Sequence, residues 1–442
     1  MIKRWVLIAK YDVVTIGSAT IDVFANTNSQ LVKFITPDGE NDFITYPSGS
    51  KMLISQLDFL VGGGGTNTAV SFSRLGLKTG FLGKLGDDEN ATKILDILTS
   101  ESVDYLGTRG GQTGYSIILN SIEHDRTILT FKGANDSFSK EEFEKTGFPD
   151  TTWLYSSSMV GESFYTLKDI FMQARQRNVR IAFNPSSYQA KKGLDELSEL
   201  LGVCDVIILN HEEAQLLLDT TGTAKELSMK LQRYEGQYIL ITQGSKGVTC
   251  YHKNKLYHLD TTPHVPVVET TGAGDAFASG FVAGLAKNFT LPDSLKLGMV
   301  QAEGVIRARG PKRSLLTYPE AQRRMQDFKG ILHKINVKTT TTSTKGRLAG
   351  DELPAFHFHA PEGKSFRLSD NTLISSMDEL AEAFTRMSDE EFAHHVSTSH
   401  DHFADWIEHV FKLKELANIL REAPTKQLHR AILRTYVTYS KR

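Results

Sequence analysis

A tight turn followed by an acidic residue is the first feature of this sequence that could carry out chemistry. Gly272, Ala273 and Gly274 form the turn, and Asp275 stands at the start of the apolar helix expected over 276–285. Free backbone N–H groups and the positive end of the helix dipole would favour a phosphoryl group at this turn. A carboxylate beside a phosphate would repel it and would contribute nothing unless it took the proton of the attacking hydroxyl. Asp275 is therefore predicted to be a general base. By itself, the pattern also fits a simple N-cap aspartate on a packed helix.

Two other segments carry polar residues and glycines at the ends of short apolar strands. Asn210 and Glu213 lie in ILNHEEAQ, whereas Thr242, Gly244 and Gly247 lie in ITQGSKGV and would let the backbone approach a nucleotide closely. The chain has no G-x-x-x-x-G-K-[ST] phosphate loop, so magnesium would carry most of the phosphate charge, with Glu213 as the residue that tunes it. Read separately, Glu213 fits a first-turn helix acid and the two glycines fit a hairpin turn.

The elements that must position these residues alternate between strand and helix. Apolar runs expected as strands occupy 11–17, 79–85, 153–156, 180–184, 205–210 and 238–243. This alternation predicts an α/β fold with a mostly parallel sheet and helices on both faces. Asp22 lies at the edge of an early strand, and the glycine run at 62–65 leads into a helix with Asn67 near its start.

Two stretches, at 25–60 and 113–132, interrupt the alternation with sequences typical of hairpins. They are predicted to project from one sheet edge as a small β lid that closes over a substrate, and to form a homodimer contact with a second copy of the chain. Phe34, Phe43 and Tyr46 would either stack on a nucleobase or form lid core and dimer contacts.

The composition changes near residue 336. A helix is expected over 318–335, after which VKTTTTSTKGRLAGDELP has no apolar period, so residues 336–350 are predicted to be a linker. A large domain is therefore expected over 1–335 and a small, mainly helical domain over 351–442. Eight of the 14 histidines lie in the small domain. Their spacing matches no zinc motif, so solvated or capping histidines are expected.

Overall composition narrows the functional classes. A net charge of -2 over 442 residues gives no electrostatic footprint for nucleic acid. The two cysteines, Cys204 and Cys250, form no spaced pair, which indicates a reducing cytoplasm. No run of apolar residues is long enough to span a membrane.

The order of the motifs resembles that of the ribokinase family of carbohydrate kinases, also called the PfkB family. The motifs are GGGGTN at 62–67, GAN at 133–135, NHEE at 210–213, TQGSKG at 242–247 and ETTGAGD at 269–275, and the resemblance covers 11–332. It implies a ribokinase-like α/β domain with a β lid, and transfer of the γ-phosphoryl group of ATP to a hydroxyl of a sugar or nucleoside. The segment at 351–442 resembles a small uncharacterised domain and implies no activity.

The resemblance also implies roles for individual residues. Asp275 matches the family's base, and the anion hole corresponds to Gly272, Ala273 and Gly274. The phosphate and magnesium motif corresponds to Asn210 and Glu213, and the nucleotide loop to Thr242, Gly244 and Gly247. The acceptor contacts correspond to Asp22, Gly63, Gly64 and Asn67. The sequence is therefore predicted to encode an ATP- and Mg²⁺-dependent small-molecule kinase. A nucleoside kinase and a binding or regulatory protein without turnover are the alternatives.

Three positions depart from the family pattern and leave the identity of the ligands open. Ribokinases commonly have Asn where this chain has Thr20 and Lys where it has Gly64, so the resemblance does not identify ribose as the acceptor. Glu269 stands where many members have Asp in the loop that binds a monovalent cation, which leaves activation by K⁺ open.

The predicted linker can be tested by limited proteolysis. Cleavage is expected between about 338 and 350, because a segment without apolar side chains is not held by a core. A chain truncated after Lys338 should stay folded and active. An insoluble or inactive truncated chain would show that the two domains are integrated.

Overall fold

The computed structural model describes most of the chain in two compact units, Met1–Thr339 and Thr340–Arg442. The described residues are 10–27, 30–36, 39–45, 49, 51–120, 126–232, 236–335, 360, 363–397, 400–411, 413–421, 423, 425–426, 429–430 and 433. Only the backbone is described for 26–27, 30–36, 39–45, 120, 126, 378, 385, 415 and 419. The predicted linker at 336–350 lies outside the described residues. No helix in the described ranges is both long enough and apolar enough to cross a membrane.

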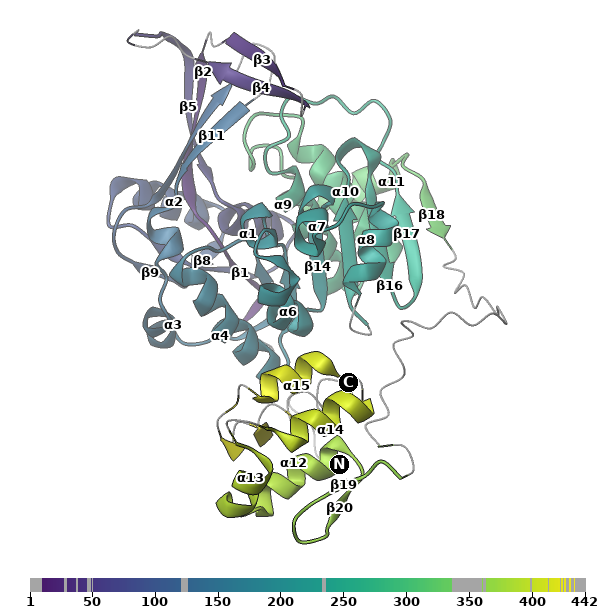
Figure 1. Ribbon diagram of the computed structural model, residues 1–442. Helices are drawn as coiled ribbons and strands as arrows, with labels where there is room; N and C mark the ends of the chain where they lie inside the picture. The colour runs from purple at the N-terminus through teal and green to yellow at the C-terminus, as the bar shows by residue number, and fades with distance from the viewer. Residues whose placement is uncertain are drawn as a thin grey trace, which may run out of the picture. The chain divides into compact units, whose positions relative to one another are not determined.

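The larger unit is built on a ten-stranded sheet with the order β18-β17-β16-β15-β14-β13-β12-β1-β6-β8 (Figure 1). Its strands are β1 (Tyr11–Ile16), β6 (Thr79–Leu82), β8 (Val103–Tyr105), β12 (Thr151–Ser156), β13 (Arg180–Phe183), β14 (Val206–Asn210), β15 (Tyr238–Thr242), β16 (Val248–His252), β17 (Lys255–Leu259) and β18 (Leu332–Ile335). From β8 to β15 the strands are parallel, and β16 to β18 are antiparallel. The predicted α/β fold with a mostly parallel sheet is confirmed.

Helices cover both faces of this sheet, because its central strands are apolar on both sides. In β14, Val206 and Ile208 belong to one core cluster and Ile207 and Leu209 to the other. The first cluster includes residues of α1 (Gly64–Arg74), α9 (Ala273–Ala286), α10 (Leu291–Val305) and α11 (Tyr318–Gln326). The second includes residues of α4 (Glu162–Gln176), α6 (Gly193–Val203), α7 (His211–Leu218) and α8 (Ala224–Leu231). The other elements around this sheet are α2 (Glu89–Ser100), α3 (Lys140–Thr146), α5 (Ser187–Ala190), the 3₁₀ turns Gly133–Asp136 and Gly244–Lys246, and the pair β7 (Lys84–Leu85) and β9 (Thr108–Arg109).

The two stretches expected to form a lid meet in a second sheet, drawn at the top of Figure 1. This sheet has the order β11-β10-β2-β5 and consists of β2 (Thr20–Thr27), β5 (Ile54–Gly62), β10 (Gly114–Asn120) and β11 (Arg126–Phe131), while β3 (Gln30–Thr36) and β4 (Gly39–Thr45) pair separately. β2 pairs in parallel with β10, with Asp22 opposite Ser116. The side chains of Phe34, Phe43 and Tyr46 lie outside the described residues, so their two interpretations stay open.

One face of the lid sheet presents apolar side chains to solvent. Phe59, Ile117 and Leu129 are 57%, 37% and 52% exposed and lie in one cross-strand row with the buried Val23. Phe131 on the same face is 52% exposed. Exposed apolar side chains on three strands of one sheet are unusual for a monomer.

The helix predicted over 318–335 is wrong in its second half. The helix α11 ends at Gln326, and Leu332–Ile335 forms the edge strand β18 against β17. Gly330 lies between them, where a Cβ atom would stand 2.1 Å from the carbonyl oxygen of Asp260. A close backbone approach of this kind ends the helix and starts the sheet pairing.

The smaller unit has its own core, and its described residues include four continuous helices. Its elements are β19 (Phe366–Arg367), β20 (Leu373–Ile374), α12 (Met377–Arg386), α13 (Asp389–His395), α14 (His402–Phe411) and α15 (Lys414–Arg421). The expectation of solvated or capping histidines is wrong for two residues of this unit: His395 and His429 are 5% and 0% exposed. His429 Nε2 bonds Asp401 Oδ2 at 2.8 Å. The described histidine, cysteine and acidic side chains form no cluster suited to a metal ion.

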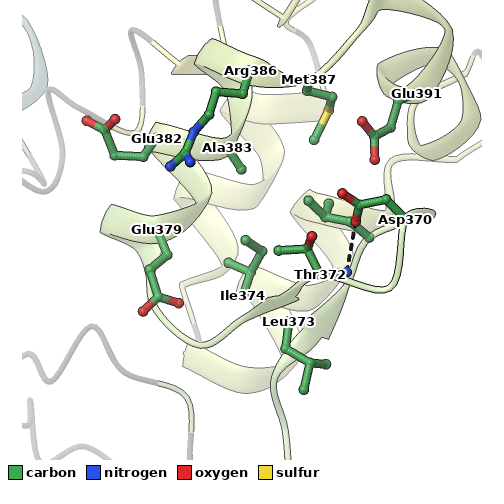
Figure 2. Close-up of a pocket in the computed structure, with 11 residues that line it drawn as sticks. Asp370, Thr372, Leu373, Ile374, Glu379, Glu382, Ala383, Arg386, Met387 and Glu391 are labelled. Atoms are coloured by element: carbon green, nitrogen blue, oxygen red, sulfur yellow. Dashed lines mark hydrogen bonds between the residues drawn. The ribbon is translucent and has the colours of Figure 1, made fainter.

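A groove of about 450 Å³ runs between α12 and the turn that joins β19 to β20 (Figure 2). Glu379, Glu382 and Arg386 line it from the helix, and Asp370 and Thr372 line it from the turn. None of the residues predicted to do chemistry lines this groove.

Candidate active site

A polar cavity of about 250 Å³ lies at the carboxyl ends of β1, β12 and β13. In an open parallel sheet this edge is the usual place for a ligand. The cavity is lined by Ser18, Gly64, Lys132, Asn135, Ser157, Ser158, Met159, Val160, Asn184, Ser186, Tyr188 and Asp275. Two predicted site residues from distant parts of the chain, Gly64 and Asp275, therefore meet here.

Asp275 is held at the start of α9 with part of its surface open to the cavity. Asn67 Nδ2 donates a hydrogen bond to Asp275 Oδ2 at 2.8 Å. Burial raises the pKa of Asp275 to about 6, although the Asn67 hydrogen bond and the Lys312 charge act in the opposite direction. A carboxylate with such a pKa is ionised near neutral pH and is a better proton acceptor than an ordinary aspartate.

The turn before Asp275 has the conformation that its glycines allow. Gly272 is the N-cap of α9 with φ of 83°, and a Cβ atom there would lie 2.6 Å from Cβ of Pro311. The N–H of Ala273 donates to the Thr270 carbonyl at 3.1 Å, so it is already bonded. Gly274 stands at an open position with no atom near its hypothetical Cβ. A ligand would reach the helix N-terminus most easily at Gly274.

Asp22 and Gly63 come from segments that border Gly64 and Asn67. Asp22 is 8% exposed and accepts a bond from the Thr20 hydroxyl at 2.8 Å, and burial raises its pKa. Gly63 has φ of 92° and would clash through a Cβ atom with the Ser18 carbonyl oxygen at 2.4 Å. The side-chain oxygen of Asn67 accepts from Lys312, and its side-chain NH₂ group donates to Asp275. Asn67 therefore positions Asp275, a role that is independent of any contact with an acceptor.

Asn210 and Glu213 form a reciprocal cap at the start of α7. The Glu213 N–H donates to Asn210 Oδ1 at 2.8 Å, and the Asn210 N–H donates to Glu213 Oε2 at 2.9 Å. Burial raises the pKa of Glu213, and the negative charge of Asp275 adds to this shift, which places the two carboxylates within electrostatic reach. Glu213 is therefore a first-turn helix acid whose carboxylate also interacts electrostatically with Asp275.

The nucleotide-loop residues lie on the next strand. Thr242 is the register partner of Asn210, so the two strand ends are adjacent. Gly244 begins a 3₁₀ turn with open space around it, whereas a Cβ atom at Gly247 would lie 2.1 Å from the Leu259 carbonyl oxygen. The main role of Gly247 is thus to let the backbone at the end of β17 pack closely. Neither glycine lines the cavity of Asp275.

Two lysines complete the charge distribution, and neither was predicted from the sequence. Lys132 lines the cavity, and its ammonium lies 4.6 Å from the ring centroid of Tyr188. Burial lowers its pKa. Lys312 is buried between Asn67 and the backbone of β5. The one available signal was the position of Lys132 directly before GAN, whereas Lys312 is one of several basic residues in RARGPKRS.

Solved structures show which class of fold this is. The adenosine kinase of Sinorhizobium meliloti superposes with a TM-score of 0.60 at 24% identity, over 72% of this chain and 99% of that one. With the sheet order and the lid, this likeness identifies a ribokinase-like fold.

The family is established by the sequence comparison. The model of the pfkB family carbohydrate kinases matches residues 10–317, and the chain belongs to that family. A fructokinase of Klebsiella pneumoniae is 28% identical over 273 residues, 59% of this chain and 83% of the relative. A ribokinase of Staphylococcus aureus is 26% identical over 313 residues, 69% of this chain and 96% of the relative. The larger unit is thus a sugar or nucleoside kinase of the ribokinase family, whose members use ATP.

The contact between Gly64 and Ser157 gives a test of the cavity wall. A Cβ atom at Gly64 would lie 2.8 Å from Oγ and 2.9 Å from Cβ of Ser157. Gly64→Ala should therefore cost roughly 1–3 kcal/mol of unfolding free energy through overpacking. Adding Ser157→Gly removes the obstructing atoms and should recover much of this loss. A double-mutant cycle by thermal unfolding measures the coupling, and additive effects would show that the two residues do not touch.

Proposed function

We propose that the larger unit transfers the γ-phosphoryl group of ATP to a hydroxyl of a sugar or sugar-like acceptor. The observation that carries the proposal is the carboxylate of Asp275, which stands at the N-terminus of α9, opens to a polar cavity and has a pKa of about 6. A base in this position can accept the proton of an acceptor hydroxyl while the helix start stabilises phosphoryl charge.

In this proposal Asp275 is the general base, and the turn of Gly272, Ala273 and Gly274 is the anion hole. Because the Ala273 N–H is bonded to Thr270, the anion hole would draw mainly on the amides of Gly272 and Gly274. Lys132 supplies a positive charge in the same cavity and lies where it can offset the charge on the transferring group.

Asn210, Glu213, Thr242, Gly244 and Gly247 form the proposed donor side. The Glu213 carboxylate accepts from the Asn210 amide and interacts with the backbone of Ser187, so it would hold magnesium through a bound water. A single carboxylate fits Mg²⁺, which usually keeps several waters and binds the phosphates themselves. When bound, the ion neutralises phosphate charge.

Asp22, Gly63, Gly64 and Asn67 form the proposed acceptor side. A carboxylate and an amide can each bond two hydroxyls, which fits a vicinal diol. A nucleoside also carries such a diol, so a nucleoside kinase is the second candidate, supported by the fold likeness to adenosine kinase. The third alternative is a nucleotide- or sugar-binding regulatory protein without turnover. ATP as donor and two buried thiols favour the cytoplasm as the place of action.

An acceptor panel tests the reaction. ATP and Mg²⁺ are supplied with D-fructose, D-ribose, their phosphates and adenosine, and ADP release is measured in K⁺ and in Na⁺ buffers. One acceptor should give ADP release well above the level without acceptor. Nucleotide binding without release on any acceptor would favour the regulatory alternative, and a rate gain in K⁺ alone would indicate a cation site near Glu269.

The Asp275→Asn variant tests the base. Asparagine keeps the size of aspartate but cannot accept the proton, so kcat should fall by roughly 10²- to 10⁴-fold. ATP binding and Tm should change little. The N-cap interpretation of Asp275 is wrong, because Gly272 is the N-cap of α9 and no side chain caps this helix. Turnover within a few-fold of wild type would remove Asp275 from the mechanism, because a first-turn acid with a structural role alone tolerates this change.

The exposed row on the lid supports a further part of the proposal, a homodimer formed through the lid sheets. Phe59→Asp should convert a dimer into a monomer, since it places a charge on the edge strand β5, at the end of the apolar row. Tyr165→Asp is the matched control, because Tyr165 is 60% exposed on α4. Light scattering at micromolar concentration gives the mass, and a monomeric wild-type protein would remove the proposal.

A further inference from the structure

The backbone around Lys312 is fixed by contacts from three directions. Arg74 Nη1 donates to the Lys312 carbonyl at 2.9 Å. The N–H of Gly310 donates to Glu269 Oε2 at 3.1 Å, and the open face of Gly272 accommodates Pro311. A segment more than 30 residues after the anion turn in the chain is thereby attached to it. The Lys312 side chain consequently enters the site from a fixed point.

The ammonium of Lys312 is buried within reach of the proposed acceptor and base residues. Lys312 is 9% exposed, and its Nζ donates to the Val61 carbonyl at 2.8 Å and to Asn67 Oδ1. The charged groups that interact with it are Asp22, Asp275, Glu101 and Arg74. Glu101 is already paired with Arg74 through two hydrogen bonds of 2.6 and 2.9 Å. The carboxylates left to balance this buried charge are Asp22 and Asp275.

Lys312 also decides which end of the Asn67 amide faces Asp275. Asn67 Oδ1 accepts from Lys312, and Nδ2 donates to Asp275 Oδ2. A flipped amide would turn its NH₂ group toward the ammonium and its oxygen toward the carboxylate, and both contacts would be repulsive. The ammonium therefore keeps the donor of Asn67 on Asp275.

We propose that Lys312 is a positioning residue for phosphoryl transfer. It fixes the side-chain amide of Asn67, which orients Asp275, and its positive charge keeps Asp275 ionised. The inference rests on the proposed function, because it requires Asp275 to be the base. Lys312 bonds Asn67 and interacts through its charge with Asp22 and Asp275, so it acts on Asp275 through these neighbours.

The charge of Lys312 changes the pKa of Asp275 in a definite direction. Burial raises the pKa of Asp275, the nearby Asp22 raises it further, and the positive charge of Lys312 lowers it. Tyr155 and Glu213 are the other titratable groups that interact with Asp275, and neither brings a positive charge. Burial lowers the pKa of Lys312 to about 7, so its charge is present in the range around pH 6 where Asp275 titrates. Without that charge, Asp275 should stay protonated to a higher pH.

Three lysine variants separate this role from a structural one. Lys312→Met removes the charge and the donors, and Lys312→Gln removes the charge but keeps N–H donors for Asn67 and Val61. The control is Lys287→Met, a partly buried lysine just past the far end of α9, about 18 Å along the helix from Asp275. Each is assayed for ADP release with whichever of D-fructose, D-ribose and adenosine the wild type uses fastest.

The readout is the acid limb of the kcat/KM profile against pH. The acid limb of the wild-type profile should have its midpoint at about pH 6, and both Lys312 variants should shift that midpoint to higher pH by roughly one unit. Lys312→Gln should lose less kcat at the pH optimum than Lys312→Met, because it still orients Asn67. Lys287→Met should leave the limb in place. An unmoved limb in either folded Lys312 variant, with Asp275→Asn strongly impaired, overturns the inference and leaves the proposed function intact.

A second measurement needs no acceptor and no turnover. In protein labelled with ¹³C at the aspartate carboxyl carbon, the resonance missing from Asp275→Asn is that of Asp275, and its titration gives the carboxyl pKa directly. The inference requires a higher value in Lys312→Gln than in wild type. Equal values overturn the inference even if no acceptor is found. A raised value beside an active Asp275→Asn enzyme would contradict the proposed function, and would leave only the effect of Lys312 on the ionisation of Asp275.

Discussion

The close packing of α9 against two neighbouring helices is the constraint on which the site depends. A Cβ atom at Gly280 would lie 2.8 Å from Cα of Gly298 in α10, and one at Gly284 would lie 2.7 Å from Cα of Ser294. On another side, the Ser279 hydroxyl donates to Ser71 Oγ of α1 at 2.7 Å. Small side chains let the three helices approach this closely, so α9 can be buried along almost its whole length. Its first turn, with Asp275, consequently has little freedom to shift.

Such packing brings ionisable groups into a region that water reaches poorly. Asp22 and Asp275 have raised pKa values and Lys312 a lowered one, all with burial as the first cause. Isolated buried charges would cost several kcal/mol each, and mutual attraction with full hydrogen bonding offsets that cost. The arrangement therefore behaves as one unit, in which a change to any member alters the ionisation of the others.

The lid and the site are connected through the backbone as well. Asp22 lies on β2, a lid strand, and the segment just before it is clamped by Asn135, whose side chain bonds both the N–H and the carbonyl of Ala19 at 2.8 and 3.0 Å. Lys132 and Gly133 connect β11 to this clamp. The GAN motif thus joins the two lid strands that lead to Asp22 and to Lys132.

The sequence by itself determined the α/β sheet, the pairs of polar residues after its strands, and the turn before Asp275, because these depend on local period and on residue type. It could not determine that α11 stops at Gln326, that Gly247 packs against β17, or that Asn67 is bonded on both sides, since each depends on a distant partner. Lys312 shows the limit most clearly. Its neighbours Arg309 and Arg313 have the same chemical character, and only the tertiary contacts of Arg74, Glu269 and Gly272 direct Lys312 into the interior. Residue type sets which chemistry a side chain can do, but the electrostatic environment that tunes it is built from segments far apart in the chain, and only folding brings those together.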